Sequence, residues 1–191
     1  MKYLTYNMSI YNLPTELSFD LFFDEWVCHI HPIDSPSALF GPFAEIVDLC
    51  RSKIKSGRLA SWNDMDFYDF VGWHGRVGLM EVIDQPFDLK VRLFGTILTD
   101  VFKESLTGKL MSEQENETPK NIIEDFKFFK AICDTPGIGL AYGPGNWVKT
   151  EYKHYTLIYI PLADDGENTT HILSIILSTT AEEPLTKLSK P

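Results

Sequence analysis

The 191-residue chain has few cysteines, few basic residues and no long apolar run. Its three cysteines, Cys28, Cys50 and Cys133, form no CxxC pair, which argues against a disulfide framework and against a zinc knuckle. No apolar run approaches the roughly 20 residues that a membrane-spanning helix needs. The N-terminus lacks the basic and apolar regions of a signal peptide. We therefore expect a cytoplasmic protein that has no membrane contact and uses no cofactor.

The charge balance is strongly acidic. The chain has 17 Lys and Arg against 27 Asp and Glu, a formal net charge of -10, and no Lys or Arg lies from Tyr3 through Cys50. Nucleic acids are bound through clustered Lys and Arg that neutralise phosphates, so we expect no nucleic-acid partner. Hydrophobic residues make up 44% of the chain, which is enough to form a buried core.

Length and patterning predict a single domain over residues 36–180, with an acidic N-terminal extension over 1–35 and a polar tail over 181–191. In the extension, residues 19–26 favour a helical turn and 27–31 a short strand. The domain starts with an amphipathic helix, from Pro36 or Pro42 to Ser56, whose apolar residues recur at three- and four-residue steps. The elements expected after it are strands at 79–83 and 89–94 that pair as a hairpin, a short helix at 97–102, a long helix at 119–133, and strands at 138–142, 152–162 and 171–178. The strand 89–94 is expected to alternate, with Leu89, Val91 and Leu93 on one face and Lys90, Arg92 and Phe94 on the other. Residues 143–146 are expected to form a turn and 163–167 a hairpin loop, and the apolar residues on both faces of 171–178 indicate cover on both sides of the sheet.

Three short motifs follow one another along this order. They are Arg92-Leu93-Phe94-Gly95-Thr96, Leu106-Thr107-Gly108 and, after Pro136, Ile160-Pro161-Leu162-Ala163-Asp164-Asp165-Gly166. Over residues 37–179 the chain resembles the PAS fold, and more narrowly a bacterial PAS-like family of compact proteins with an N-terminal helix before the PAS core. The family pattern usually has a Pro-x-Arg element before the first strand, where this chain reads Leu59-Ala60-Ser61-Trp62-Asn63-Asp64.

The resemblance implies an α+β fold: a five-stranded antiparallel sheet with helices on one face, and an additional N-terminal helix. It also implies a sensory domain in signal transduction that binds a small molecule between sheet and helices and is not an enzyme. Polar groups for such a ligand are expected from Arg92, Tyr155 and Tyr159. Apolar walls are expected from Trp62, Trp73, Phe102, Phe126 and Tyr142, although each of these aromatic residues also suits a plain core position.

Two other functions are compatible with the sequence. One is a homodimeric protein-interaction module with a filled core, which docks through the apolar helix face of Leu39, Phe43, Ile46 and Cys50. The other is a metal-dependent enzyme that uses His29 and His31, because two histidines two residues apart in a strand share one face. No second pair of ligands is spaced to complete such a site, and no G-x-S-x-G elbow supports nucleophilic catalysis, so we expect no metal.

Overall fold

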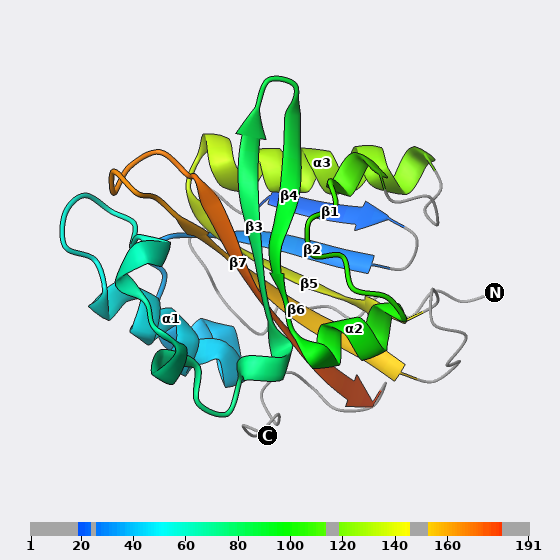
Figure 1. Cartoon of the computed structure of the whole chain (residues 1–191), viewed down its shortest axis with the longest axis horizontal. Helices are drawn as coiled ribbons and strands as arrows, with labels where there is room; N and C mark the ends of the chain where they lie inside the picture. Colours follow the sequence, from blue (N-terminus) through cyan, green and yellow to red (C-terminus); the bar gives the residue numbers. More distant parts are fainter. Residues whose placement is uncertain (1–18, 24–25, 114–118, 146–152, 181–191) are drawn as a thin grey trace.

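The computed structural model describes residues 19–23, 26–113, 119–145 and 153–180 (Figure 1). The strands are β1 (Phe19–Phe23), β2 (Trp26–Pro32), β3 (Val77–Asp84), β4 (Phe87–Phe94), β5 (Gly137–Pro144), β6 (Lys153–Leu162) and β7 (His171–Thr180). The α-helices are α1 (Ala44–Ser52), α2 (Thr96–Phe102) and α3 (Pro119–Asp134). Five 3₁₀ helices accompany them: η1 (Ser37–Phe43), η2 (Trp62–Asp64), η3 (Phe67–Phe70), η4 (His74–Arg76) and η5 (Met111–Glu113).

The strands form one sheet in the order β1-β2-β5-β6-β7-β3-β4, and every neighbouring pair is antiparallel. The α+β class with an antiparallel sheet is therefore confirmed. The predicted number of five strands is wrong, because β1 and β2 belong to the stretch that was expected to be an extension. Residues 19–23 form a strand rather than a helical turn, since β2 pairs with β5 and provides an edge on which β1 completes its own hydrogen bonds.

One face of the sheet is covered by η1 and α1. Phe43, Ile46 and Cys50 are almost fully buried there, against Leu140 of β5 and Ile158 of β6. Side chains of a strand alternate between faces, so every second residue of β5, β6 and β7 contacts these helices. The apolar helix face that was expected to form a dimer is thus buried in this core.

The opposite face is covered by α2 and α3. Phe128 and Ile132 of α3 pack against Cys28 of β2 and Leu89 of β4, and Leu98 of α2 packs beside Tyr155. Helices therefore cover both faces. In Figure 1, α3 is seen at the top of the molecule and α1 at the lower left. Helices α2 and α3 share one face, and the additional N-terminal helix α1, whose face the expectation left open, lies on the other. The apolar residues on both faces of the predicted strand 171–178 already indicated cover on both sides.

The β3–β4 hairpin has its predicted position but not its predicted alternation. Leu79 pairs with Leu93 and the next residue, Met80, pairs with Val91, so the register shifts by one residue at this point. Arg92 therefore has no pairing partner on β3. Because a bulge adds one residue to a strand, the residues beyond it point to the opposite faces from those that simple alternation predicts. Leu93 is consequently 39% exposed, and Phe94 turns toward α2.

Two boundaries differ from the prediction. The expected helix over 36–56 changes from 3₁₀ to α geometry after a non-helical residue, Gly41, and ends at Ser52. Strand β5 continues to Pro144, so the first half of the expected turn Gly143–Asn146 is strand and Asn146 lies outside the described residues. Within the described ranges, no helix combines the length and the apolar character that a membrane crossing requires.

Candidate functional site

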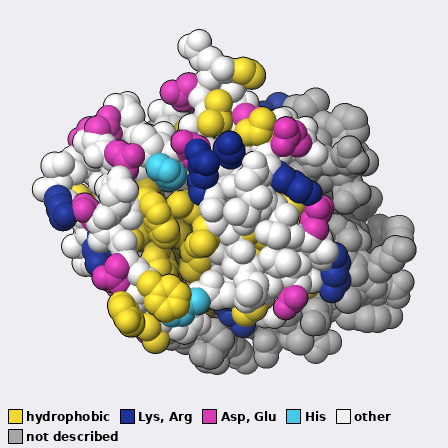
Figure 2. Space-filling model, viewed as in Figure 1, with side chains coloured by type: hydrophobic (Ala, Val, Ile, Leu, Met, Phe, Trp, Pro, Cys, Tyr) yellow, Lys and Arg dark blue, Asp and Glu magenta, His cyan; other side chains and the backbone are white. Residues whose placement is uncertain are grey.

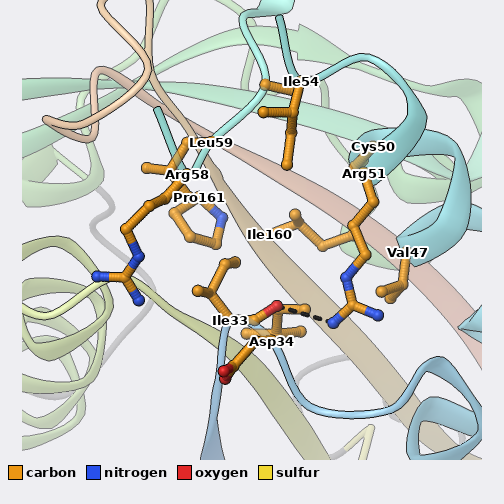
Figure 3. Close-up of a pocket in the computed structure, with 12 residues that line it drawn as sticks. Ile33, Asp34, Val47, Cys50, Arg51, Ile54, Arg58, Leu59, Ile160 and Pro161 are labelled. Carbon is orange, nitrogen blue, oxygen red and sulfur yellow. Dashed lines mark hydrogen bonds between the residues drawn. The ribbon is translucent and has the colours of Figure 1, made fainter. Parts of the chain in front are cut away.

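A pocket of about 320 Å³ lies where the end of α1 meets the sheet (Figure 3). It is formed by α1, by the turn after β2, by the loop that follows α1, and by the adjoining ends of β5 and β6. Its lining consists of Ile33, Asp34, Val47, Cys50, Arg51, Ile54, Arg58, Leu59, Ala60, Ile138, Ile160 and Pro161. Nine of these are apolar or thiol side chains, so the pocket is an aliphatic hollow with three charged residues.

Arg51 fixes one wall of the pocket. Its guanidinium donates to the carbonyl oxygens of Ile33 at 2.7 Å and Ser35 at 2.5 Å, and to Ser37 Oγ at 2.7 Å. Ser37 Oγ in turn donates to Asp48 on the preceding turn of α1. Hydrogen bonds from a charged donor are stronger than neutral ones, so this clasp ties the turn after β2 to the helix.

The opposite wall is a loop held against the β6–β7 hairpin. The carbonyl oxygen of Gly166 accepts from the backbone N–H groups of Arg58 at 2.8 Å and Leu59 at 3.0 Å. Asp164 accepts from Ser61 Oγ at 2.8 Å and from the Asn63 side chain at 3.3 Å. The segment before β3 is thus hydrogen-bonded to the turn between β6 and β7.

Asp165 stabilises the hairpin turn beside this loop. Its carboxylate accepts from the Asn168 side chain and from the backbone N–H groups of Glu167 and Asn168, and these bonds lower the pKa of Asp165 to about 2. Because the pKa is depressed, the turn keeps this stabilisation at neutral pH and loses it as the pH falls through about 2.

We expect an NMR titration of the Asp165 carboxyl carbon to give a midpoint near that value. In Asn168→Ala the midpoint should rise toward the ordinary range of Asp, because the largest contribution to the lowered pKa is the side-chain hydrogen bond from Asn168. Glu167→Ala is the matched control, since it keeps the backbone donor. An unchanged midpoint in Asn168→Ala contradicts this assignment.

The thiols of the chain are poor nucleophiles. Burial raises the pKa of Cys50, which lines the pocket, to about 12, and burial likewise raises the pKa of Cys28 to about 12. The thiolate is the reactive form of cysteine, so both side chains are protonated at neutral pH. Cys50 contributes an apolar contact to the pocket.

The structure does not bring the eight predicted ligand-binding residues to one place, and none of them lines the pocket described above. Tyr155 and Tyr159 lie on the face of α2 and α3, where the Tyr159 ring is 5.1 Å from that of Phe129. On the same side Phe102 packs on Phe94, and Phe126 packs on Phe87. These side chains therefore form aromatic contacts with their neighbours on this face.

The other predicted residues are dispersed. Trp73 is 2% exposed and packs on Phe43, and Trp62 packs on Phe70, both on the face of α1. Tyr142 stacks on His154. Arg92 forms an ion pair with Glu81 on the surface, so its charge already has a partner.

His29 and His31 share one face of β2, as predicted, with ring centroids 6.3 Å apart. His31 is buried with its ring edge-on to Phe40. The described part of the chain offers no group of three or more His, Cys, Asp and Glu residues that suits a metal ion. The structure therefore adds no third ligand to the two histidines.

A second surface feature is an apolar patch on η3 and the residue after it. Phe67, Tyr68 and Val71 are 69%, 80% and 61% exposed, and the His74 ring stacks on Phe67 at 3.9 Å. Figure 2 shows hydrophobic side chains at this lower left edge of the molecule and in the depression above it. Exposed apolar groups gathered in this way are typical of contact surfaces.

Sequence reasoning missed the pocket because it selected large aromatic side chains and tyrosine hydroxyls. The residues that line the pocket are aliphatic, and they are distributed over segments that are far apart in the chain. The one feature of the sequence that could have indicated this pocket is the position of Arg51 and Arg58. They are the first arginines in the sequence, and they flank the end of the predicted helix.

No protein-family model, no curated protein and no solved structure matches this chain.

Proposed function

We propose that the chain is a PAS-like, non-catalytic module that binds a small, largely apolar molecule in the pocket beside α1. The observation that carries this proposal is the pocket itself, a hollow of about 320 Å³ with aliphatic walls and few polar groups. Sites for small ligands usually have this composition, with a few polar groups that fix the orientation of the ligand.

The arrangement of the sheet supports the PAS-like part of the proposal. Strands β4-β3-β7-β6-β5 are contiguous and antiparallel, and α2 and α3 lie between β4 and β5 in the sequence. This subset has the number and direction of strands that the resemblance implies. The hairpin β1–β2 extends it at the edge of β5.

The lining of the pocket favours binding over turnover. It has one carboxylate, Asp34, and no histidine, serine, threonine or tyrosine that would act with it as an acid and base pair. The thiol of Cys50 is protonated at neutral pH because burial raises its pKa to about 12. A ligand here would contact α1, the turn after β2 and the loop after α1 together, so it would shift these segments toward the arrangement that binds it best.

The test uses octan-1-ol, a neutral apolar probe, and methyl-detected NMR. In the wild type, octan-1-ol should shift the methyl signals of Ile54 and Ile160 in a saturable way and should raise the melting temperature. In Ile54→Trp the indole should fill the half-exposed end of the pocket, so that octan-1-ol no longer shifts the Ile160 methyl signals or raises the melting temperature. The matched control is Leu49→Trp, which enlarges a partly buried residue of α1 outside the pocket lining.

Saturation at 100 times Kd corresponds to about 2.7 kcal/mol of added stability, which a thermal melt detects readily. The proposal fails if neither octan-1-ol nor its carboxylate analogue shifts the pocket methyl signals. It also fails if the two tryptophan variants behave alike, because binding would then not depend on the pocket.

Protein interaction is a second candidate function, favoured by the exposed side chains of Phe67, Tyr68 and Val71. This patch is separate from the pocket, since none of its residues lines it. The two functions would therefore use different surfaces, and a partner bound through η3 would leave the pocket open.

A further inference from the structure

We infer that the ligand of this pocket is a monocarboxylate with an apolar body, and that Arg58 binds its carboxylate. This inference rests on the proposed function and names the chemical class of the ligand. Three observations support it: the state of Arg58, the state of Arg51 and the composition of the remaining lining.

Arg58 is an exposed arginine at the mouth of the pocket, and its guanidinium forms no hydrogen bond or ion pair with any described residue. Its backbone is nevertheless fixed, because its N–H donates to the carbonyl oxygen of Gly166. The other arginines that line or flank the sheet are engaged: Arg92 pairs with Glu81, and Arg76 donates to the carbonyl oxygen of Ile176. Arg58 therefore presents a free cationic fork from a fixed position.

Arg51 provides a second positive charge on the other side of the hollow (Figure 3). Its guanidinium donates to two carbonyl oxygens and a hydroxyl, so none of these bonds is to a carboxylate. Both donors of Nη2 are used by Ile33 and Ser35. Arg51 therefore adds electrostatic attraction for an anion but has few free donors with which to bind one.

The pocket holds a single acidic group, Asp34, which forms no ion pair with Arg51 or Arg58. Two guanidinium groups and one carboxylate leave a net positive charge of one in a protein whose overall charge is -10. One excess charge matches a monoanion better than a phosphate dianion, which Asp34 would repel more strongly than it repels a monoanion. A carboxylate also fits the planar fork of an arginine with two parallel hydrogen bonds.

The rest of the lining is aliphatic, so the body of the ligand has to be apolar. A volume of about 320 Å³ is at the small end of ligand pockets, which corresponds to a molecule of roughly ten to fifteen heavy atoms. Octanoate has these properties and serves as the probe. Octan-1-ol and octylamine have the same chain with a neutral and a cationic head.

The experiment measures the three Kd values at neutral pH by the methyl shifts of Ile54 and Ile160. The Kd of octanoate should be at least about tenfold lower than that of octan-1-ol, because a hydrogen bond to a charged group contributes about that factor. Octylamine should bind most weakly of the three. Raising the salt concentration should weaken octanoate binding and leave octan-1-ol binding unchanged.

Arg58→Gln should remove the preference, so that octanoate binds no more tightly than octan-1-ol, and Arg58→Lys should restore part of it. The matched control is Arg92→Gln, which makes the same change in net charge at a surface site away from the pocket and should leave both Kd values unchanged. Equal affinities for octanoate and octan-1-ol in the wild type overturn the inference and leave the proposed function standing. If neither probe shifts the pocket methyl signals, the proposed function fails and the inference fails with it.

Discussion

Gly166→Ala is expected to lower the free energy of unfolding by about 2–4 kcal/mol. Gly166 has φ +81°, a left-handed conformation that disfavours any residue with a Cβ. An added Cβ would also lie 2.3 Å from the carbonyl oxygen of Ser56, which is backbone and has little freedom to move. The loop after α1 would then have to separate from the β6–β7 hairpin. Urea unfolding followed by circular dichroism measures the loss.

Gly108→Ala is the matched control for this prediction. Gly108 has φ +88°, close to that of Gly166, but no atom lies within 4 Å of its added Cβ. Gly108→Ala should therefore lower the free energy of unfolding by about 1 kcal/mol, which is the cost of placing alanine in a left-handed conformation without a steric clash. The difference between the two variants isolates the close contact that holds the pocket wall. Equal losses would show that this contact adds nothing to stability.

Elements with a strong local pattern were predictable from the sequence. The stripe of Ile46, Val47 and Cys50 identified α1, and the alternating run from Leu89 identified β4, because helix and strand periods are properties of neighbouring residues. The final hairpin was recognised from the Asp164-Asp165-Gly166 turn between two apolar runs. The ends of these elements differ from the prediction by a few residues, and within β4 the bulge at Arg92 changes the faces on which Leu93 and Phe94 lie.

The additional edge of the sheet was not predictable in this way. Strand β1 has a place in the fold only because β2 pairs with β5, a partner from the far end of the chain. Long-range pairing leaves no periodic signal in either segment. The bulge at Arg92 has a similar origin, because it depends on how β4 registers against β3. Arg92 was consequently assigned to a ligand site, whereas it pairs with Glu81.

The predicted ligand-binding residues do not line the pocket described above, for a related reason. Aromatic residues such as Tyr159 and Phe126 have large contact areas that suit a pocket or a core equally, and in this fold they pack against one another. The pocket is instead built from aliphatic residues whose proximity arises from the tertiary structure. Arg51 and Arg58, which flank the predicted helix end, are as typical of a surface helix terminus as of a binding site.

Arg51→Met is expected to destabilise the protein by about 2–4 kcal/mol. The substitution keeps an unbranched apolar stem but removes the guanidinium that binds the carbonyl oxygens of Ile33 and Ser35 and the hydroxyl of Ser37. Ser35 is 8% exposed, so its carbonyl oxygen would lose its partner in a place where water has little access. Chemical denaturation gives the loss of stability, and faster amide hydrogen exchange at residues 33–37 should accompany it.

Lys130→Met is the matched control, since Lys130 is also a basic residue on a helix. It pairs with Asp134 at 2.8 Å, but both side chains are more than half exposed, and such pairs contribute about 0.5 kcal/mol or less. The contrast between the two variants therefore separates a clasp on buried carbonyl oxygens from an exposed ion pair. If Arg51→Met costs no more than Lys130→Met, the clasp does not hold the turn after β2 in place. In that case the packing of Ile33 and the backbone hydrogen bond from Ser35 to the carbonyl oxygen of Pro32 would hold the wall of the pocket that contains Ile33 and Asp34.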